Sequence, residues 1–209
     1  MKKTIFTTIL LLGLISISFN SMGAGGRYYY EDEEYTGSIT ALRNWTFFQI
    51  GLWPGVPGVT RESNVCGLKL GIPMSAGNGY VNGMELGVIS CSTSNVVGFQ
   101  FSSFLNTSKE LYGAQFGMVN LSSEACYGFQ AGLANINSND NGGLQMAAAN
   151  IAKESFSGVQ LGTFNTAKAV HGLQMGIVNI TDECGLQFGL VNIISDGWLP
   201  FCILFNFSF

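Results

Sequence analysis

The stretch GLQMGIVNITDECGLQFGLVN, from Gly172 to Asn192, contains nearly the same unit twice, with the copies thirteen residues apart. Each copy reads Gly, Leu, Gln, an apolar residue, Gly, two apolar residues and Asn. Apolar side chains alternate with Gly and Gln over the first six residues, and a period of two residues is typical of a β-strand. The stretch therefore predicts strands with one apolar face and one small, polar face.

This unit recurs along most of the chain, with steps of 13 to 16 residues between successive first glycines. Those glycines are Gly67, Gly83, Gly98, Gly113, Gly128, Gly143, Gly158, Gly172 and Gly185. The third residue is Lys69 and then Glu85 in the first two units, and afterwards Gln100, Gln115, Gln130, Gln145, Gln160, Gln174 and Gln187. The eighth residue in the last six units is Asn120, Asn135, Asn150, Asn165, Asn179 and Asn192. Imperfect units flank the series at Phe47–Trp53 and Leu199–Asn206. Repetition at this spacing indicates one structural element per unit.

The connections between units are polar. They include NSNDNG and TDEC, which are rich in turn-forming residues. From Gly98 onward, all charged residues fall in these connections: Lys109, Glu110, Glu124, Asp140, Lys153, Glu154, Lys168, Asp182, Glu183 and Asp196. Each unit is therefore predicted to be a strand followed by a short turn.

Three closed all-β arrangements can keep so many apolar strand faces out of water when no helix covers them. They are a transmembrane barrel with its apolar face toward lipid, a soluble barrel with that face inward, and a parallel β-solenoid with one unit per coil. We expect the first, an antiparallel meander closed as an outer-membrane-type β-barrel of about 10–12 strands. A tilted strand of this length covers the apolar band of such a barrel, and the chain ends in alternating aromatics at Phe205, Phe207 and Phe209. The β-solenoid remains the alternative, with Gln and Asn stacked into ladders; its polar turns count against it.

The start of the chain has the pattern of a secretory signal peptide. Lys2 and Lys3 precede an apolar run from Ile5 to Ile17, and small residues follow. We divide the chain into residues 1–24 (signal peptide), 25–38 (an acidic, Tyr-rich segment) and 39–209 (the β-repeat domain). Export predicts an outer-membrane or cell-surface location in a bacterium.

Composition excludes some functions. The net charge is −4, so the chain offers no basic surface for nucleic acid. Membrane lipid is the expected partner, because the apolar face of the expected barrel meets it. The five cysteines have no metal-site spacing. No cofactor or metal site is predicted, and the protein is expected not to be an enzyme. His171 is the only histidine and has no nucleophile motif beside it; we interpret it as a structural residue at a strand edge.

Lys69 and Glu85 are the most distinctive candidates, because they replace Gln in adjacent units. One hypothesis places them at a charged constriction of a narrow channel; the other makes them a cross-strand ion pair of small energetic value. In both cases the pair is expected to mark the polar face as hydrated.

The G-(L/V)-Q-(L/F)-G-(L/I)-V-N unit, repeated behind a signal peptide, resembles a family of bacterial surface-repeat proteins. The resemblance covers Gly67 to Asn192 and is loose in the flanks. It implies a surface or outer-membrane location and a repeat architecture, without implying an activity. We expect the role to be structural or surface-interactive, and the alternative is an exported β-solenoid adhesin or binding protein.

Overall fold

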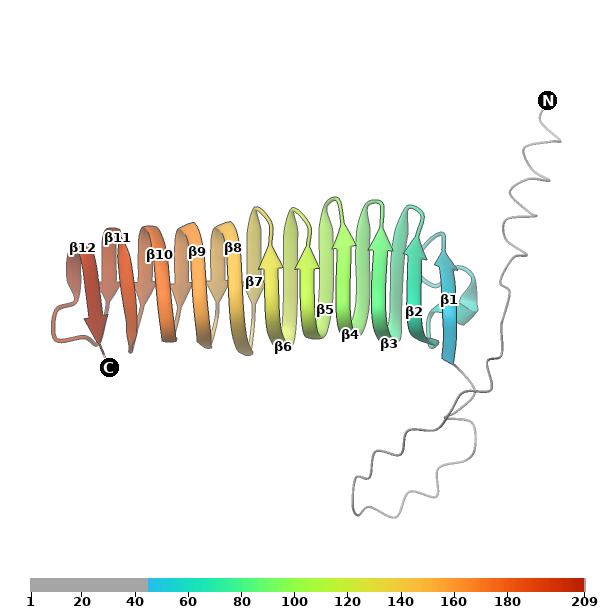
Figure 1. The fold of residues 1–209 in the computed structure, drawn as a ribbon, viewed down its shortest axis with the longest axis horizontal. Helices are drawn as coiled ribbons and strands as arrows, with labels where there is room; N and C mark the ends of the chain where they lie inside the picture. Colours follow the sequence, from blue (N-terminus) through green and yellow to red (C-terminus); the bar gives the residue numbers. More distant parts are fainter. Residues whose placement is uncertain (1–44, 209) are drawn as a thin grey trace, which may run out of the picture.

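The computed structural model describes residues 45–208, which wind into a rod made of one continuous sheet (Figure 1). The predicted signal peptide and acidic segment lie outside the described residues. The strands are β1 (Trp45–Gly51), β2 (Asn64–Gly71), β3 (Met74–Gly87), β4 (Ser90–Ser102), β5 (Leu105–Phe116), β6 (Val119–Ala131), β7 (Ala134–Asn137), β8 (Asp140–Ala152), β9 (Ser155–Ala167), β10 (Ala169–Thr181), β11 (Gly185–Ile194) and β12 (Phe201–Ser208). A single 3₁₀ turn, η2 (Gly58–Thr60), interrupts the first connection.

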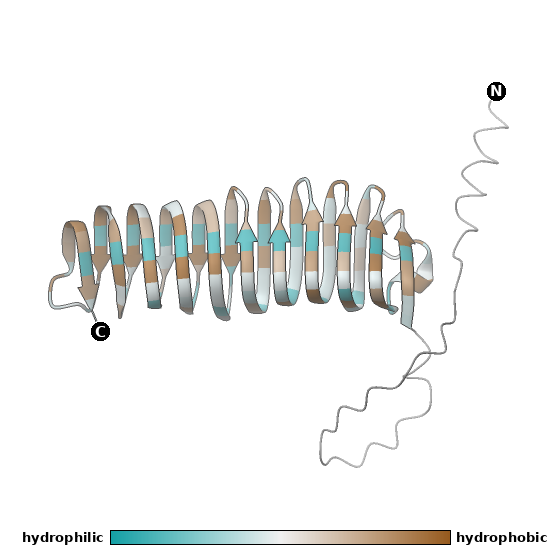
Figure 2. Cartoon of the chain, viewed as in Figure 1, coloured by the Kyte–Doolittle hydropathy of each residue, from teal (hydrophilic) through white to brown (hydrophobic). Residues whose placement is uncertain are grey.

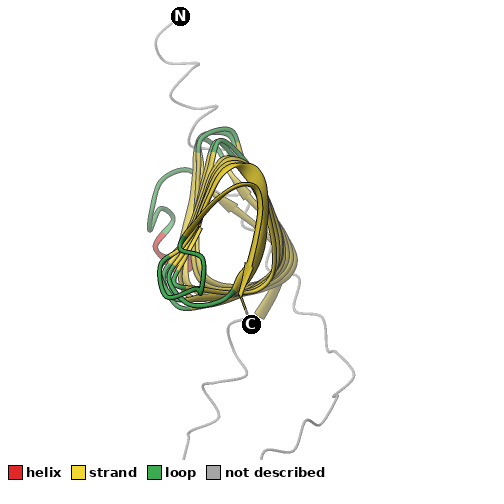
Figure 3. Ribbon diagram, turned by 90° about the vertical axis from the view of Figure 1, so that its left-hand side faces the viewer, coloured by secondary structure: helices red, strands yellow, loops and turns green. Residues whose placement is uncertain are grey.

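Neighbouring strands from β1 to β11 are parallel, and each repeat position lies directly on the same position of the next unit. In the β8–β9 pair, for example, Gln145 is opposite Gln160 and Asn150 is opposite Asn165. Because β7 is short, β8 also pairs with β6. Viewed along the rod, the coils superpose into one elongated ring (Figure 3). The all-β repeat prediction is confirmed, and the fold is a parallel β-solenoid.

The expected antiparallel barrel is wrong, and the solenoid alternative is correct. Alternation along a strand fixes which side chains share a face, but not whether the next strand runs parallel or antiparallel to it. The polar turns had counted against the solenoid on the assumption that its interior must be apolar. The interior is instead largely polar.

The coil that begins at Gly172 shows how the side chains are arranged. Gln174, Asn179 and Thr181 are fully buried inside the coil, whereas Met175 and Ile177 point outward and are 44% and 49% exposed. Gln174 and Asn179 are both buried although they are five residues apart, so strand alternation is broken between them: the chain bends there, and the two amides come from segments on either side of the bend. Hydrophilic bands therefore cross the middle of the strands, with hydrophobic residues beside them (Figure 2).

Buried apolar residues form small clusters inside the rod. One contains Ala152, Phe156, Ala167 and Val170, and another contains Val96, Leu111 and Cys126. These clusters lie next to the polar turns, one or two residues before or after a polar connection. Apolar packing therefore supports one end of these coils, and side-chain hydrogen bonds hold much of the remaining interior together.

The first glycine of each unit occupies a position that only glycine fits. Gly128 has φ +137°, and a Cβ built on it would lie 2.0 Å from the carbonyl oxygen of Gly113 in the preceding coil. The corresponding glycines from Gly67 to Gly185 all have positive φ. These glycines are required by the backbone conformation and, in most coils, by the close approach of the coil before them.

The last strand, β12, reverses direction and pairs antiparallel with β11. Phe205 lies directly opposite Phe188, with ring centroids 4.9 Å apart. The predicted aromatic C-terminal strand is therefore present, but it ends a solenoid. Phe209 lies outside the described residues.

Candidate functional site

The repeated glutamines form a continuous hydrogen-bonded ladder through the rod. From Gln115 onward, each side-chain amide donates to the side-chain carbonyl oxygen of the glutamine in the preceding coil, at distances of 2.6 to 2.9 Å. The members are Gln100, Gln115, Gln130, Gln145, Gln160, Gln174 and Gln187, and each is at most 2% exposed. Mutual hydrogen bonding compensates for the cost of removing these amides from water.

A second ladder of asparagines lies on the opposite wall. Here each amide donates to the following coil, at 2.8 to 2.9 Å, so the donors point in the opposite direction. Its members are Asn106, Asn120, Asn135, Asn150, Asn165, Asn179 and Asn192. We did not predict Asn106, because it stands one position later in its unit than the other asparagines. Most amides also donate to a backbone carbonyl, as Asn179 does to Phe188 at 2.9 Å.

Each ladder ends in an acceptor that has no hydrogen-bond partner within residues 45–208. These acceptors are Gln187 Oε1 at the C-terminal end of one ladder and Asn106 Oδ1 at the N-terminal end of the other. The pattern follows from the opposite donor directions. Within the two ladders, unsatisfied side-chain atoms therefore occur only at the ends; Gln49, Ser102, Ser108, Asn137 and Asn141, which lie outside the ladders, each also have one buried atom without a partner.

Gln160→Leu tests the ladder in its middle. The substitution leaves the Gln174 amide without its 2.8 Å acceptor and the Gln145 carbonyl without its 2.7 Å donor. An orphaned buried polar group costs about 1–3 kcal/mol, so we expect the free energy of unfolding to fall by roughly 2–5 kcal/mol. Urea denaturation followed by circular dichroism measures the change. Val159→Leu, at a partly exposed outward position, is the control and is expected to stay within about 0.5 kcal/mol of the wild type.

Lys69 and Glu85 are brought together, as expected for adjacent units, with Lys69 Nζ 3.6 Å from Glu85 Oε1. The expectation that they mark a hydrated face is wrong, because their side chains are 2% and 0% exposed. Burial lowers the pKa of Lys69 from its ordinary value, and the neighbouring Glu85 carboxylate opposes that shift. They lie in the packed interior of the solenoid, and the barrel lumen that they were expected to line does not form.

Glu85 also terminates the glutamine ladder. Its Oε2 accepts from the Gln100 amide at 2.8 Å, and its Oε1 accepts from the hydroxyls of Ser75 at 2.5 Å and Thr93 at 2.6 Å. Lys69 donates to the Thr93 hydroxyl at 2.7 Å. The charge is thus held by four polar neighbours. Ser75 and Thr93 were not singled out from the sequence, because the Ser and Thr residues of the connections carry no pattern that distinguishes them.

Many large hydrophobic side chains are exposed on the outside of the rod. Outward aromatic rings contact one another from coil to coil. The ring centroid of Phe116 lies 5.1 Å from that of Phe99 and 5.2 Å from that of Phe129. The ring centroids of Tyr112 and Tyr127 are 5.7 Å apart. Tyr112 and Tyr127 are 47% and 42% exposed. An apolar exterior around a polar interior inverts the usual distribution in a water-soluble protein.

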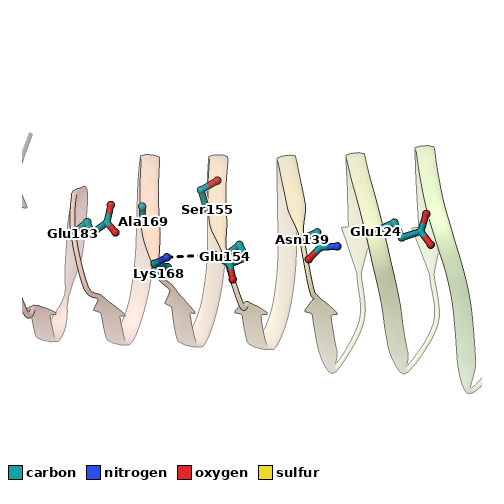
Figure 4. A pocket seen from close by; sticks show the side chains of 7 residues that line it. All are labelled: Glu124, Asn139, Glu154, Ser155, Lys168, Ala169 and Glu183. Carbon is teal, nitrogen blue, oxygen red and sulfur yellow. Dashed lines mark hydrogen bonds and ion pairs between the residues drawn. The ribbon is translucent and has the colours of Figure 1, made fainter.

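Charged side chains gather along one edge, where they line a shallow groove of about 490 Å³ (Figure 4). The groove is lined by Glu124, Asn139, Glu154, Ser155, Lys168, Ala169 and Glu183. Lys168 pairs with Glu154 at 3.5 Å, and their side chains are 53% and 52% exposed. Exposed pairs of this kind contribute little to stability. The groove therefore offers solvated charges.

His171 lies exposed on the outer face, where its Nδ1 is 3.7 Å from Cys184 Sγ. No carboxylate hydrogen-bonds to this histidine in the part of the chain that the structure describes. All five cysteines are free. Burial raises the pKa of the Cys126 thiol to about 12 and raises that of Cys91 further, whereas Cys66 is exposed.

Residues 45–208 contain no group of three or more His, Cys, Asp or Glu side chains placed to hold a metal ion. Over the same residues, no helix is long and apolar enough to cross a membrane. Comparison of the chain with protein-family models, with curated proteins and with solved structures gives no match.

Proposed function

We propose that this protein is an exported, non-enzymatic β-solenoid rod that acts at the bacterial cell surface through contacts made by its exterior. The observation that carries the proposal is the inverted polarity of the coils. Amide side chains such as Gln174 and Asn179 are fully buried, while Met175 and Ile177 in the same coil are about half exposed. Apolar surface on this scale marks a site of interaction with lipid or protein.

The signal-peptide pattern and the resemblance to surface-repeat proteins support the location. The buried ladders support a structural role, because the amides within them are hydrogen-bonded to one another from coil to coil. A channel is no longer favoured, since the Lys69–Glu85 pair on which that hypothesis rested lies inside a packed coil.

Labelling of intact cells with a membrane-impermeant maleimide tests the location. A variant with Cys184→Ser and Cys202→Ser retains the exposed Cys66 and the buried Cys91 and Cys126. We expect one label per chain on intact cells, because thiols with raised pKa carry almost no reactive thiolate at pH 7.

The control adds Cys66→Ser to that variant and should abolish labelling. Labelling of Cys66 only after the cells are lysed would contradict a surface location. Labelling of all three cysteines on intact cells would contradict the buried positions of Cys91 and Cys126.

A further inference from the structure

The two long edges of the rod differ sharply in chemistry. One edge is formed by the bend within each unit, which follows the second small residue, and it carries apolar or small neutral residues in successive coils. Its exposed members are Ile72, Val88, Ile89, Ser103, Phe104, Met118, Leu133, Ala148, Thr163, Ile177 and Leu190. We call this row the apolar edge. The large hydrophobics in it are 42% to 58% exposed.

The opposite edge is formed by the connections between units, and we call it the charged edge. It holds every exposed charged side chain of the described residues, with Lys109, Glu124, Glu154, Lys168 and Glu183 recurring at nearly the same position in successive coils. In Figure 2 the apolar edge follows the upper turns and the charged edge follows the lower turns. The rod is therefore amphipathic across its width.

The backbone of the apolar edge is already hydrogen-bonded from coil to coil. The amide of Leu133 donates to Met118 at 2.8 Å, and the amide of Val119 donates to Phe104 at 2.7 Å. Ser103 and Ala149 donate to Val88 and Leu133 in the same way, at 3.3 and 3.0 Å. Entry into hydrocarbon demands that backbone polar groups be satisfied internally, and this edge meets that demand.

From these observations we infer that the apolar edge inserts into one leaflet of a lipid bilayer, with the rod lying parallel to the membrane and its charged edge in water. The inference deepens the proposed surface role and rests on it. Amphipathic helices bind the membrane interface in this way, burying an apolar face about 5–10 Å deep.

The shape of the edge favours lipid over a second copy of the chain. The apolar residues form a ridge along the bends, and Met175 and Tyr112, on the strand segments that carry the glutamine ladder, are also exposed. A second rod would cover one flat wall, whereas fluid lipid can surround a ridge. No charged residue lies on the ridge, and Lys109, Lys153 and Lys168 are outnumbered by acidic residues on the charged edge. Binding is therefore expected not to depend on anionic lipid.

Flotation with vesicles of phosphatidylcholine tests the inference on purified protein, at low and at 0.5 M salt, roughly where charge effects are screened. We expect the mature chain to float with the vesicles at both salt concentrations. Met118→Glu is expected to weaken partitioning about tenfold, because it puts a charge in place of apolar side-chain area that the bilayer would otherwise bury. Adding Leu133→Glu should weaken it by about a further tenfold.

Ser123→Glu is the matched control, because it places the same charge on the charged edge of the same coil. It should float like the wild type, and circular dichroism should show the same fold for all the variants. Equal flotation of Met118→Glu and Ser123→Glu would overturn the inference, as would wild-type protein that stays with the soluble fraction.

Sedimentation velocity without lipid tests the remaining alternative, in which the apolar edge binds a second copy of the chain. A wild-type oligomer that Met118→Glu dissociates, with no flotation of the wild type, would assign the edge to contacts between copies and overturn the lipid assignment. The proposed surface location is tested separately by the labelling of intact cells. Flotation of purified protein does not depend on export, so the two proposals can fail independently.

Discussion

Glu85→Gln is expected to lower the free energy of unfolding by about 3–5 kcal/mol, although it installs the residue that later units carry at this position. The substitution removes the carboxylate that balances Lys69, whose ammonium group is buried 3.6 Å away. It also removes the acceptors of the Ser75 and Thr93 hydroxyls and the Gln100 amide. A glutamine carbonyl replaces only part of this set, and an uncompensated charge remains inside the rod.

The double variant Lys69→Gln/Glu85→Gln is expected to regain most of that loss. It removes both charges and extends the glutamine ladder by two coils, since Lys69, Glu85 and Gln100 occupy equivalent positions in β2, β3 and β4. Buried ion pairs can often be replaced by well-packed neutral residues at little cost. The expected coupling free energy between the two sites is therefore several kcal/mol.

Hydrogen exchange measured separately over β2–β4 and β9–β11 shows where the effect lies. Because coils contact only their neighbours, protection should fall near the substitution and persist at the far end. A Glu85→Gln variant as stable as the wild type would mean that Lys69 is not held in the interior. Additive effects of the two substitutions would also contradict the ion pair.

Gly128→Ala is expected to destabilise the rod by roughly 3–5 kcal/mol. The backbone at this position has φ +137°, which costs a residue with a Cβ about 1–3 kcal/mol. The new methyl group would also lie 2.0 Å from the Gly113 carbonyl oxygen. That carbonyl is backbone, so the adjacent coils must separate and lose hydrogen bonds worth about 1 kcal/mol each.

Gly58→Ala provides the control, because nothing lies within 4 Å of a Cβ built there and no positive φ is present. Its effect should stay within about 0.5 kcal/mol. Thermal unfolding followed by circular dichroism compares the two. Equal melting temperatures for Gly128→Ala and the wild type would show that the coils are not stacked at this spacing.

Much of the fold could be predicted from the sequence. The alternation around Gln174 correctly placed the apolar and polar residues on opposite faces. The thirteen- to sixteen-residue step correctly indicated that each repeat forms one structural element. The sequence could not show whether the polar interior was a hydrated lumen or a packed ladder. An amide face suits a hydrated lumen and a packed ladder equally well, and the difference depends on whether neighbouring strands are parallel, a long-range property.

For the same reason, the contact between the candidate residues could be predicted from the sequence, but their burial could not. Adjacency of Lys69 and Glu85 followed from their equivalent positions in successive units, so their contact was predicted correctly. Their burial was not, because it depends on the ring closing around them. The apolar edge was also missed as a separate feature, since residues such as Phe104 and Leu133 become a row only when the coils are stacked.

Two engineered disulfides test the parallel coil most directly. In a cysteine-free background, we would pair Leu144→Cys with Val159→Cys, and separately Met146→Cys with Leu161→Cys. Both pairs face one another in the parallel register of β8 and β9, at a separation that a disulfide spans. The solenoid predicts that both cross-links form under mild oxidation. In an antiparallel hairpin, the same fifteen-residue offset cannot be in register at both places, so formation of at most one cross-link would contradict the parallel β-solenoid.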